Sequence, residues 1–365
     1  MDTANSQPNS NRIPEFLAGK SSQQYLLLSG NALDILKDIP SESIDMTITS
    51  PPYWQQRKYT HPHSIGNEPS LSDYIDNLLQ VFAEVKRILK PEGSCWLNLG
   101  DTYRHKNLQG IPWRIAIALQ DTQGWILRND VIWHKIKGSP DNSKDKLRTV
   151  HEYLFHLVKQ PKYYYDVDAI RKTAKSSRVK KNGQVVTATG VSGVNYRRQI
   201  NRTSELDKLE KANALQALDN ALEKVKEGKW FDFRMVIRGQ QRTTHSDAVE
   251  VSGRALELKK KGFYILPYHG KGSKPADVWD ILPEDRWRKD KHFAPFPEEL
   301  CLIPMKASCP RGGIVLDPFV GTGTAILTAV KLGRRGLGID LSPEYLTVAK
   351  ERLSQYQPSL FQLLP

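Results

Sequence analysis

Hydrophobic spacing predicts alternating strands and helices over the first 170 residues. Short continuous apolar or β-branched runs are typical of buried strands, and apolar side chains three or four positions apart are typical of an amphipathic helix. The clearest such helix has Ser72 as its expected cap and Pro91 and Gly93 as its expected stop. The expected strands are 25–28, 44–49, 95–99, 131–133 and 153–158, and the expected helices are 32–36, 72–89 and 111–120.

The same alternation returns after residue 276. Two strands are expected at 314–316 and 336–339. Helices are expected from Pro297 and Glu298 onward, over 322–332 and over 343–353. Strands that alternate with helices favour an α/β fold, a mostly parallel twisted sheet with helices on both faces.

The segment between these two parts has a different character. Gly, Ser, Thr, Lys and Arg dominate from 171 to about 202, and a mixed stretch runs over 230–272. Between them, 204–227 predicts one amphipathic helix, because apolar side chains form a stripe along it. The expected stripe consists of Leu206, Leu209, Leu215, Leu218, Leu222 and Val225.

A chain of 365 residues suggests two domains, or one large α/β domain with an insertion. Residues 1–24 are rich in Ser, Asn and Gln and are expected to form a flexible tail. The sheet domain is then expected to comprise 25–170 and 276–365, and 171–275 is expected to be an insertion into it.

Composition excludes several classes of protein. No run approaches 18 apolar residues, so a membrane span is not expected, and the polar N-terminus does not resemble a secretory signal. Three cysteines cannot form a disulfide framework or a four-cysteine zinc site. His61, His63, His151 and His156 lack the spacing of metal ligands. We therefore expect a cytoplasmic protein without a metal.

The positive charge is concentrated in the middle of the chain. Lys and Arg number 53 and Asp and Glu 40, a net charge of +13. Residues 171–275 hold 23 basic and 10 acidic side chains, and the remainder holds 30 of each. A polyanion such as nucleic acid is the natural partner of such a segment, and a solvated basic surface is the alternative.

The first motif, Asp-Pro-Phe-Val-Gly-Thr-Gly-Thr, lies between an expected strand and an expected helix. Its small residues let a ligand approach the backbone. A carboxylate 23 positions after the aspartate of the motif is placed to accept hydrogen bonds from ribose hydroxyls. The single G-x-G after Asp-Pro-Phe points towards S-adenosyl-L-methionine rather than a pyrophosphate cofactor. A tight turn without a ligand is the alternative. The candidate cofactor-binding residues are Asp317, Phe319, Gly321, Gly323, Thr324 and Asp340.

The second motif is Ser50-Pro51-Pro52-Tyr53, directly after the expected strand 44–49. Two prolines restrict the backbone and remove N–H donors. The Ser50 hydroxyl and the Pro51 carbonyl would then form a pair of acceptors, and Tyr53 offers a flat face for stacking. This set suits the binding of a planar ring with an exocyclic amino group. A proline-rich connection is the alternative.

Together the two motifs resemble those of the DNA amino-methyltransferases, whose catalytic motif is Asp/Asn/Ser-Pro-Pro-Tyr/Phe/Trp. Residues 98–103 and 292–300 resemble further stretches of that family. In the family, the helix after the second stretch closes over the methionine end of the cofactor. The resemblance therefore adds Phe296 and Pro297 to the expected cofactor-binding residues.

The order of the motifs is similar to the circularly permuted beta class of the family. The resemblance implies a Rossmann-like methyltransferase domain, with 171–275 as its target-recognition region. It also implies S-adenosyl-L-methionine as cofactor and double-stranded DNA as partner, in the bacterial or archaeal cytoplasm near the nucleoid. A restriction endonuclease acting on the same site is the usual companion of such enzymes.

The resemblance also implies a mechanism, in which the target base is flipped out and stacks on Tyr53, aided by Trp54. Ser at the first motif position goes mostly with N4 of cytosine and Asp mostly with N6 of adenine. Ser50 therefore favours cytosine N4, with adenine N6 as the alternative. Residues 133–135 are expected near the base pocket, and His151 and Glu152 are expected to be structural or to line the substrate. A methyltransferase for RNA or protein amides, and a non-catalytic DNA-binding module, are the rival functions.

Overall fold

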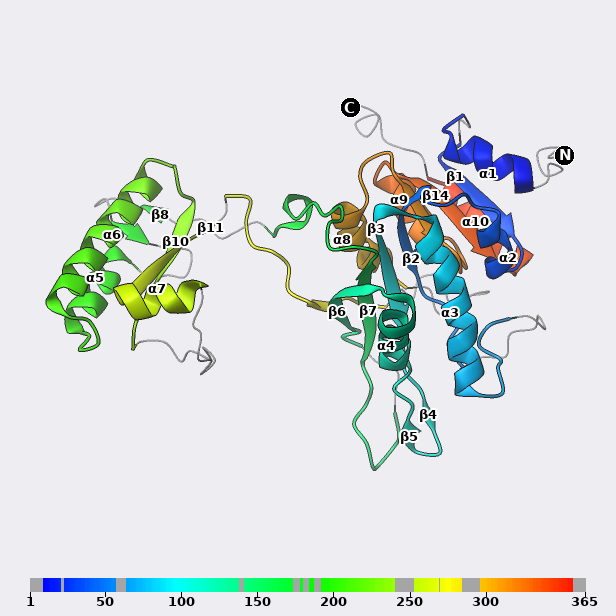
Figure 1. Ribbon diagram of the computed structural model, residues 1–365, viewed down its shortest axis with the longest axis horizontal. Helices are drawn as coiled ribbons and strands as arrows, with labels where there is room; N and C mark the ends of the chain where they lie inside the picture. Colours follow the sequence, from blue (N-terminus) through cyan, green and yellow to red (C-terminus); the bar gives the residue numbers. More distant parts are fainter. Residues whose placement is uncertain are drawn as a thin grey trace. The chain divides into compact units, whose positions relative to one another are not determined.

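The computed structural model divides the chain into two compact units (Figure 1). The sheet unit comprises Met1–Ile170 and Ala276–Pro365, and the inserted unit comprises Arg171–Pro275. The residues that the structure describes are 9–20, 23–56, 64–137, 141–172, 178–179, 184–186, 192–239, 253–268, 270–283 and 296–356.

The described part of the sheet unit contains one eight-stranded sheet, in the order β1-β14-β13-β2-β3-β7-β6-β12. Neighbouring strands are parallel except where β7 pairs with β3 and β6, so β7 alone runs against the others. The predicted mostly parallel sheet is confirmed. Its strands are β1 (Tyr25–Ser29), β2 (Ile44–Thr49), β3 (Leu89–Leu99), β6 (Ile126–His134), β7 (His151–Val158), β12 (Val278–Asp280), β13 (Ile314–Asp317) and β14 (Arg335–Asp340).

Helices cover both faces of the sheet (Figure 1). Successive side chains of a strand point to opposite faces, and β13 shows the two environments. Leu316 packs in the apolar cluster that holds α2, α3 and α4, whereas Val315 packs in the cluster that holds α8 and α9. None of the described helices is long and apolar enough to cross a bilayer. The helices are α2 (Ala32–Lys37), α3 (Leu71–Ile88), α4 (Ile111–Gln123), α8 (Glu298–Ser308), α9 (Thr324–Lys331) and α10 (Pro343–Ser354).

Two boundaries around α3 differ from the expectation. The N-cap is Ser70, whose side chain accepts a hydrogen bond from the Asp73 amide, and Ser72 lies within the helix. After α3 the chain enters β3 directly at Leu89, so the strand passes through Pro91 and Gly93. The register between β2 and β3 shifts along this stretch, which accommodates both residues in the sheet.

Part of the expected flexible tail, 1–24, is wrong, because helix α1 (Asn9–Leu17) forms within it, and residues 1–8 lie outside the described ones. Ile13 is fully buried and Phe16 is 2% exposed, so these two side chains fix the helix to the sheet unit. Arg335 donates to the Phe16 carbonyl at 2.7 Å and its guanidinium lies 5.5 Å from the Phe16 ring centroid. A polar average composition hid this pair of apolar residues one helical turn apart.

The inserted unit has an apolar core of its own, in which Tyr196, Ile200, Leu218 and Phe233 are buried. The expected helix at 204–227 forms as α6, with a capping box at its N-terminus in place of a start at 204. Leu209 lies outside the stripe, because it is 71% exposed. The elements are β8 (Arg178–Val179), β9 (Val185–Val186), α5 (Gly193–Arg202), α6 (Lys208–Lys226), β10 (Asp232–Ile237), α7 (Gly253–Lys261) and β11 (Phe263–Tyr268).

Candidate active site

The two sequence motifs lie side by side at the carboxyl edge of the sheet. Strand β13 pairs in parallel with β2 on one side and with β14 on the other, so the loops after all three strands leave at the same edge. The Thr49 hydroxyl donates to Asp317 Oδ1 at 2.6 Å, and both side chains are buried. This hydrogen bond joins the start of the Ser50 motif to the start of the Asp317 motif.

The loop after Asp317 is held by hydrogen bonds to both carboxylates of the motif. Asp317 Oδ1 accepts from the Phe319 amide at 3.0 Å, and Asp340 Oδ2 accepts from the Gly321 amide at 2.8 Å. Gly323 has a φ of 81°, and a Cβ there would lie 2.9 Å from the Ala349 Cβ. Glycine is therefore required at 323 both by the backbone conformation and by the packing of α10.

Four of the expected cofactor residues differ in accessibility. Asp317 and Thr324 are buried, and the Thr324 hydroxyl accepts from the Arg352 guanidinium at 3.0 Å. Asp340 is partly exposed, and its second oxygen accepts from the Ser342 amide at 2.9 Å. Phe319 is also partly exposed. The carboxylate that faces the edge is thus Asp340, whereas Asp317 and Thr324 shape the loop from within.

Phe296 and Pro297 precede helix α8 on the face opposite α3. Phe296 packs against the cluster that holds α8 and α9, and the buried Pro297 is the N-cap of α8. Lys331 of α9 donates to both carboxylate oxygens of Glu298, at 2.9 and 2.7 Å, which ties the two helices together. Residues 292–295 of the expected motif lie outside the described residues.

Ser50 belongs to a hydrogen-bonded cluster at the ends of four strands. Its hydroxyl donates to Tyr53 Oη at 3.2 Å, and Tyr53 Oη donates to Glu152 Oε2 at 2.8 Å. Asn98 Nδ2 donates to Glu152 Oε2 at 2.7 Å and lies 3.0 Å from Tyr53 Oη and 3.4 Å from Ser50 Oγ. The Lys135 ammonium forms an ion pair with Glu152. We call these five residues the Ser50 cluster.

Tyr53 is held as a neutral phenol. Burial, together with the neighbouring Glu152 carboxylate, raises the pKa of Tyr53 well above its ordinary value. Gly100 lies against its ring, because a Cβ at Gly100 would be 2.8 Å from Tyr53 Cε2. The phenol therefore stays protonated at neutral pH and donates a hydrogen bond to Glu152.

The two prolines of the motif place their carbonyls differently. The Pro52 carbonyl accepts from Tyr74 Oη at 2.9 Å. Within the described part of the chain, the Pro51 carbonyl accepts no hydrogen bond. The expectation that Trp54 helps to stack a base is corrected, because Trp54 is 5% exposed and its indole donates to the Glu68 carbonyl. Pro51 is buried and its carbonyl keeps its acceptor capacity, whereas Tyr53 is partly exposed.

The sequence pattern assigned no catalytic role to Asn98, Lys135 or Glu152. Asn98 lies near the carboxyl end of β3 and Lys135 directly follows β6. Glu152 stands at the beginning of β7, which reaches the same edge because β7 is antiparallel. Polar residues at strand ends could therefore have predicted these three site residues, but only with knowledge of the direction of β7. Among the described atoms, Asn98 Oδ1 is buried without a hydrogen-bond partner.

The cysteines and histidines take no part in the Ser50 cluster. All three cysteines are buried, and burial raises the pKa of Cys309 to about 12. His156 is buried and stacks on Trp96 with ring centroids 4.2 Å apart. His61 and His63 lie outside the described residues. Across the ranges that the structure describes, no group of three His, Cys, Asp or Glu side chains is placed to hold a metal ion.

Comparisons with known proteins match almost the whole chain. The model of the DNA methylase family N6_N4_Mtase matches residues 44–351. Type II methyltransferase M.SfiI of Streptomyces fimbriatus is 30% identical over 91% of each chain. M.XycI of Xanthomonas campestris pv. cyanopsidis is 29% identical over 92% of this chain and 90% of its own.

Two solved structures share the fold. The PvuII DNA methyltransferase (cytosine-N4-specific) has a TM-score of 0.57 at 16% identity, covering 93% of this chain and 89% of its own. TTHA0409, a putative DNA modification methylase from Thermus thermophilus crystallised with S-adenosyl-L-methionine, has a TM-score of 0.50 at 22% identity. That match covers 91% of this chain and 93% of TTHA0409.

Burial makes the stability of this edge dependent on pH. Burial raises the pKa of Asp317 to about 7, although the hydrogen bonds from Thr49 and Phe319 act to lower it. Between the ordinary pKa of an aspartate and pH 7, the folded protein holds a proton on Asp317 that the unfolded protein has lost. The free energy of unfolding therefore falls as pH rises through that interval. We expect Asp317→Asn to gain about 1–3 kcal/mol of unfolding free energy relative to the native protein between pH 5 and pH 8.

Urea unfolding of both proteins at the two pH values measures this difference. Asp34→Asn is the matched control, because the Asp34 side chain is 76% exposed. The same pH dependence in the native protein and in Asp317→Asn would contradict the assigned protonation of Asp317.

Proposed function

Because this chain belongs to the DNA methylase family N6_N4_Mtase, we propose that it methylates the exocyclic N4 of a cytosine flipped out of double-stranded DNA. The chain is a DNA methyltransferase, and S-adenosyl-L-methionine is its methyl donor. The observation that carries the proposal is the position of the Ser50 hydroxyl. It lies in a hydrogen-bonded cluster directly beside the Asp317 loop, joined to that loop through Thr49.

Cytosine is favoured over adenine by the residue at the first motif position. Ser50 supplies a neutral hydroxyl at this position. In the family that the chain resembles, Ser there goes mostly with cytosine N4 and Asp mostly with adenine N6. The PvuII enzyme, which shares the fold, is described as cytosine-N4-specific. N6 of adenine is the alternative target, since both amino groups present the same pair of N–H donors.

The Ser50 cluster supports a specific way of binding the amino group. Asn98 donates towards Ser50 Oγ, and Ser50 donates its own proton to Tyr53, so the oxygen keeps a lone pair free to accept. The Pro51 carbonyl supplies a second acceptor. Two N–H bonds to these acceptors favour a pyramidal amino nitrogen, whose lone pair is then available for attack. The Tyr53 ring offers a stacking surface, worth about 1–3 kcal/mol for one base.

The same cluster offers a route for the proton that the methylated nitrogen must lose. That proton passes to Ser50 Oγ as the Ser50 proton moves to Tyr53 Oη and the Tyr53 proton moves to Glu152. Each hydroxyl gains one proton and loses one, so the net transfer is from the nitrogen to the Glu152 carboxylate. Lys135 forms an ion pair with Glu152 and so keeps the carboxylate in place beside Tyr53.

The Asp317 loop fits the methyl donor by its geometry. The Asp340 carboxylate accepts hydrogen bonds from the Gly321 and Ser342 amides, and its two oxygens have further lone pairs for ribose hydroxyls. Gly321 and Gly323 bring no side chains to the loop, and Phe319, Phe296 and Pro297 supply apolar contacts. The buried Asp317 and Thr324 hold the loop in shape. S-adenosyl-L-methionine supplies an electrophilic methyl group on its sulfonium when bound.

The inserted unit is proposed to recognise the target sequence. Its 23 basic and 10 acidic residues give it the net charge that attracts phosphates, and its own core makes it a distinct body. The relatives are named Type II methyltransferases, so we further propose a restriction–modification role. The partner would be an endonuclease that cleaves the same site.

The product of the reaction tests the choice of base. Purified protein, S-adenosyl-L-methionine and unmethylated plasmid DNA should yield N4-methyldeoxycytidine when the DNA is digested to nucleosides and measured by mass spectrometry. N6-methyldeoxyadenosine as the sole product would establish the alternative. Methyl transfer to RNA or protein but not to DNA, or DNA binding without any transfer, would support one of the rival functions.

Two substitutions should separate the two halves of the site. Ser50→Ala should lower kcat by about 10²–10³-fold while the affinity for S-adenosyl-L-methionine stays within about twofold, because an acceptor used in the transition state is lost. Asp340→Ala should weaken cofactor binding by about 10–100-fold, because a carboxylate acceptor is lost. Calorimetric titration and steady-state rates measure both quantities.

Asp38→Ala is the control for Asp340→Ala, because Asp38 is an exposed aspartate at the end of α2. It should change neither quantity. Equal loss of cofactor affinity in Ser50→Ala and Asp340→Ala would refute the separate roles.

A further inference from the structure

Two segments extend from the sheet next to the Ser50 cluster. The hairpin prong, residues 102–109, follows β3 and contains β4 (Tyr103–Arg104) and β5 (Asn107–Leu108). The loop prong, residues 136–150, connects β6 to β7, and its residues 138–140 lie outside the described ones. Both project beyond the sheet in Figure 1. Since Asn98, Lys135 and Glu152 stand at their bases, both prongs begin at the cluster.

The two prongs contact each other. Lys106 of the hairpin prong pairs with Asp145 of the loop prong at 2.7 Å. The Lys146 ammonium lies 4.9 Å from the centroid of the Tyr103 ring. A cavity of about 250 Å³ lies between the prongs, with Asp101 and Tyr103 on one side and Lys146 and Arg148 on the other. The prongs therefore form one surface.

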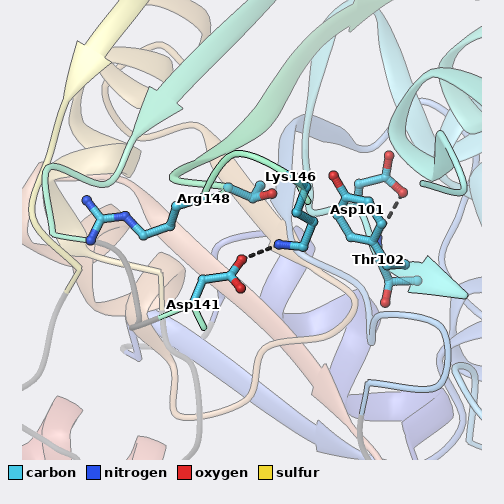
Figure 2. Close-up of a pocket in the computed structure, with 7 residues that line it drawn as sticks. Asp101, Thr102, Asp141, Lys146 and Arg148 are labelled. Atoms are coloured by element: carbon cyan, nitrogen blue, oxygen red, sulfur yellow. Dashed lines mark hydrogen bonds and ion pairs between the residues drawn. The ribbon is translucent and has the colours of Figure 1, made fainter. Parts of the chain in front are cut away.

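This surface is basic although the sheet unit as a whole is neutral. The prongs carry six basic side chains and two acidic ones within 23 residues. Figure 2 shows Lys146 linked to Asp141 in the cavity, whereas Arg148 has no such link. Among the residues that the structure describes, Arg148 makes no hydrogen bond or ion pair. Its guanidinium is therefore available to an anion from outside.

Leu147 is the apolar exception on this basic surface. It is 90% exposed and stands between Lys146 and Arg148, and it does not line the cavity that both neighbours line. Burial of this side chain against a partner would be favourable, because it would remove apolar surface from water. An apolar side chain flanked by cations matches the chemistry of proteins that insert a wedge between bases while they bind phosphates.

Building on the proposed function, we propose that the two prongs hold the duplex at the target nucleotide and that Leu147 enters the base stack there. Flipping leaves a gap that exposes the faces of the adjacent bases to water, and an apolar side chain in the gap covers them. Arg148 binds a backbone phosphate beside that gap. The Ser50 cluster at the base of the prongs then receives the extruded base.

The wedge role of Leu147 is tested on a duplex in which the target base is unpaired and no wedge is needed to extrude it. Full-length Leu147→Ala is assayed on a duplex carrying the site found methylated in plasmid DNA, and on the same duplex with an abasic nucleotide opposite the target. The base opposite an abasic nucleotide is unpaired and flips at lower cost. We expect kcat/KM to fall about tenfold or more on the paired duplex and less than about threefold on the abasic one.

Leu147→Met should restore transfer to the paired duplex, and Ile117→Ala, at a 50% exposed position on α4, should change neither rate. Equal losses of Leu147→Ala on the two duplexes, or no loss on either, would overturn the wedge. If the native protein methylates neither duplex, the proposed function fails and the wedge fails with it. Activity of the native protein distinguishes the two failures.

The phosphate contact is tested by the salt dependence of binding. A cation that neutralises one phosphate contributes about 0.9 to the slope of log K against log salt concentration. Arg148→Gln should therefore reduce the slope for the paired duplex by about 1. Lys350→Gln, an exposed cation on α10, should leave it unchanged. An unchanged slope in Arg148→Gln would overturn the contact.

Discussion

The hydrogen bond from Thr49 to Asp317 is the interaction on which the arrangement of the site depends. Asp317 is 1% exposed, and a buried carboxylate is costly unless donors surround it. Thr49 from β2 and the Phe319 amide from its own loop supply those donors. Hydrogen bonding to one buried group thus fixes the relative position of the Ser50 loop and the Asp317 loop, whose bonded residues are 268 positions apart in the chain.

Strand direction then decides which other side chains reach this edge. Ser50, Asn98 and Asp340 stand near the carboxyl ends of strands that run the same way. Glu152 joins them from the opposite end of β7, because β7 is reversed. A fully parallel sheet would place that residue at the far edge, away from Tyr53. The reversed strand therefore completes the cluster with the carboxylate that receives hydrogen bonds from Tyr53 and Asn98.

Most of the sheet and both motifs were predictable from sequence, because buried strands and glycine-rich turns leave strong local patterns. Strand β2 occupies the expected residues 44–49. The helix around Ile13 was missed because two apolar residues are outweighed by a polar composition. The roles of Lys135 and Glu152 depend on pairing between distant strands, which local spacing does not encode. The basic prongs were hidden because a charge count over the whole sheet unit sums to zero.

The pairing of β2 with β13 also has a consequence for how the protein is made. A ribosome adds about 5–20 residues per second, so roughly 15–50 s separate the emergence of Thr49 from that of Asp317. During that interval the edge of β2 that later receives β13 has no partner, while the inserted unit can already form its own core. A nascent chain that stalls before residue 317 holds the Ser50 loop without the Asp317 loop, and it therefore lacks half of the candidate site.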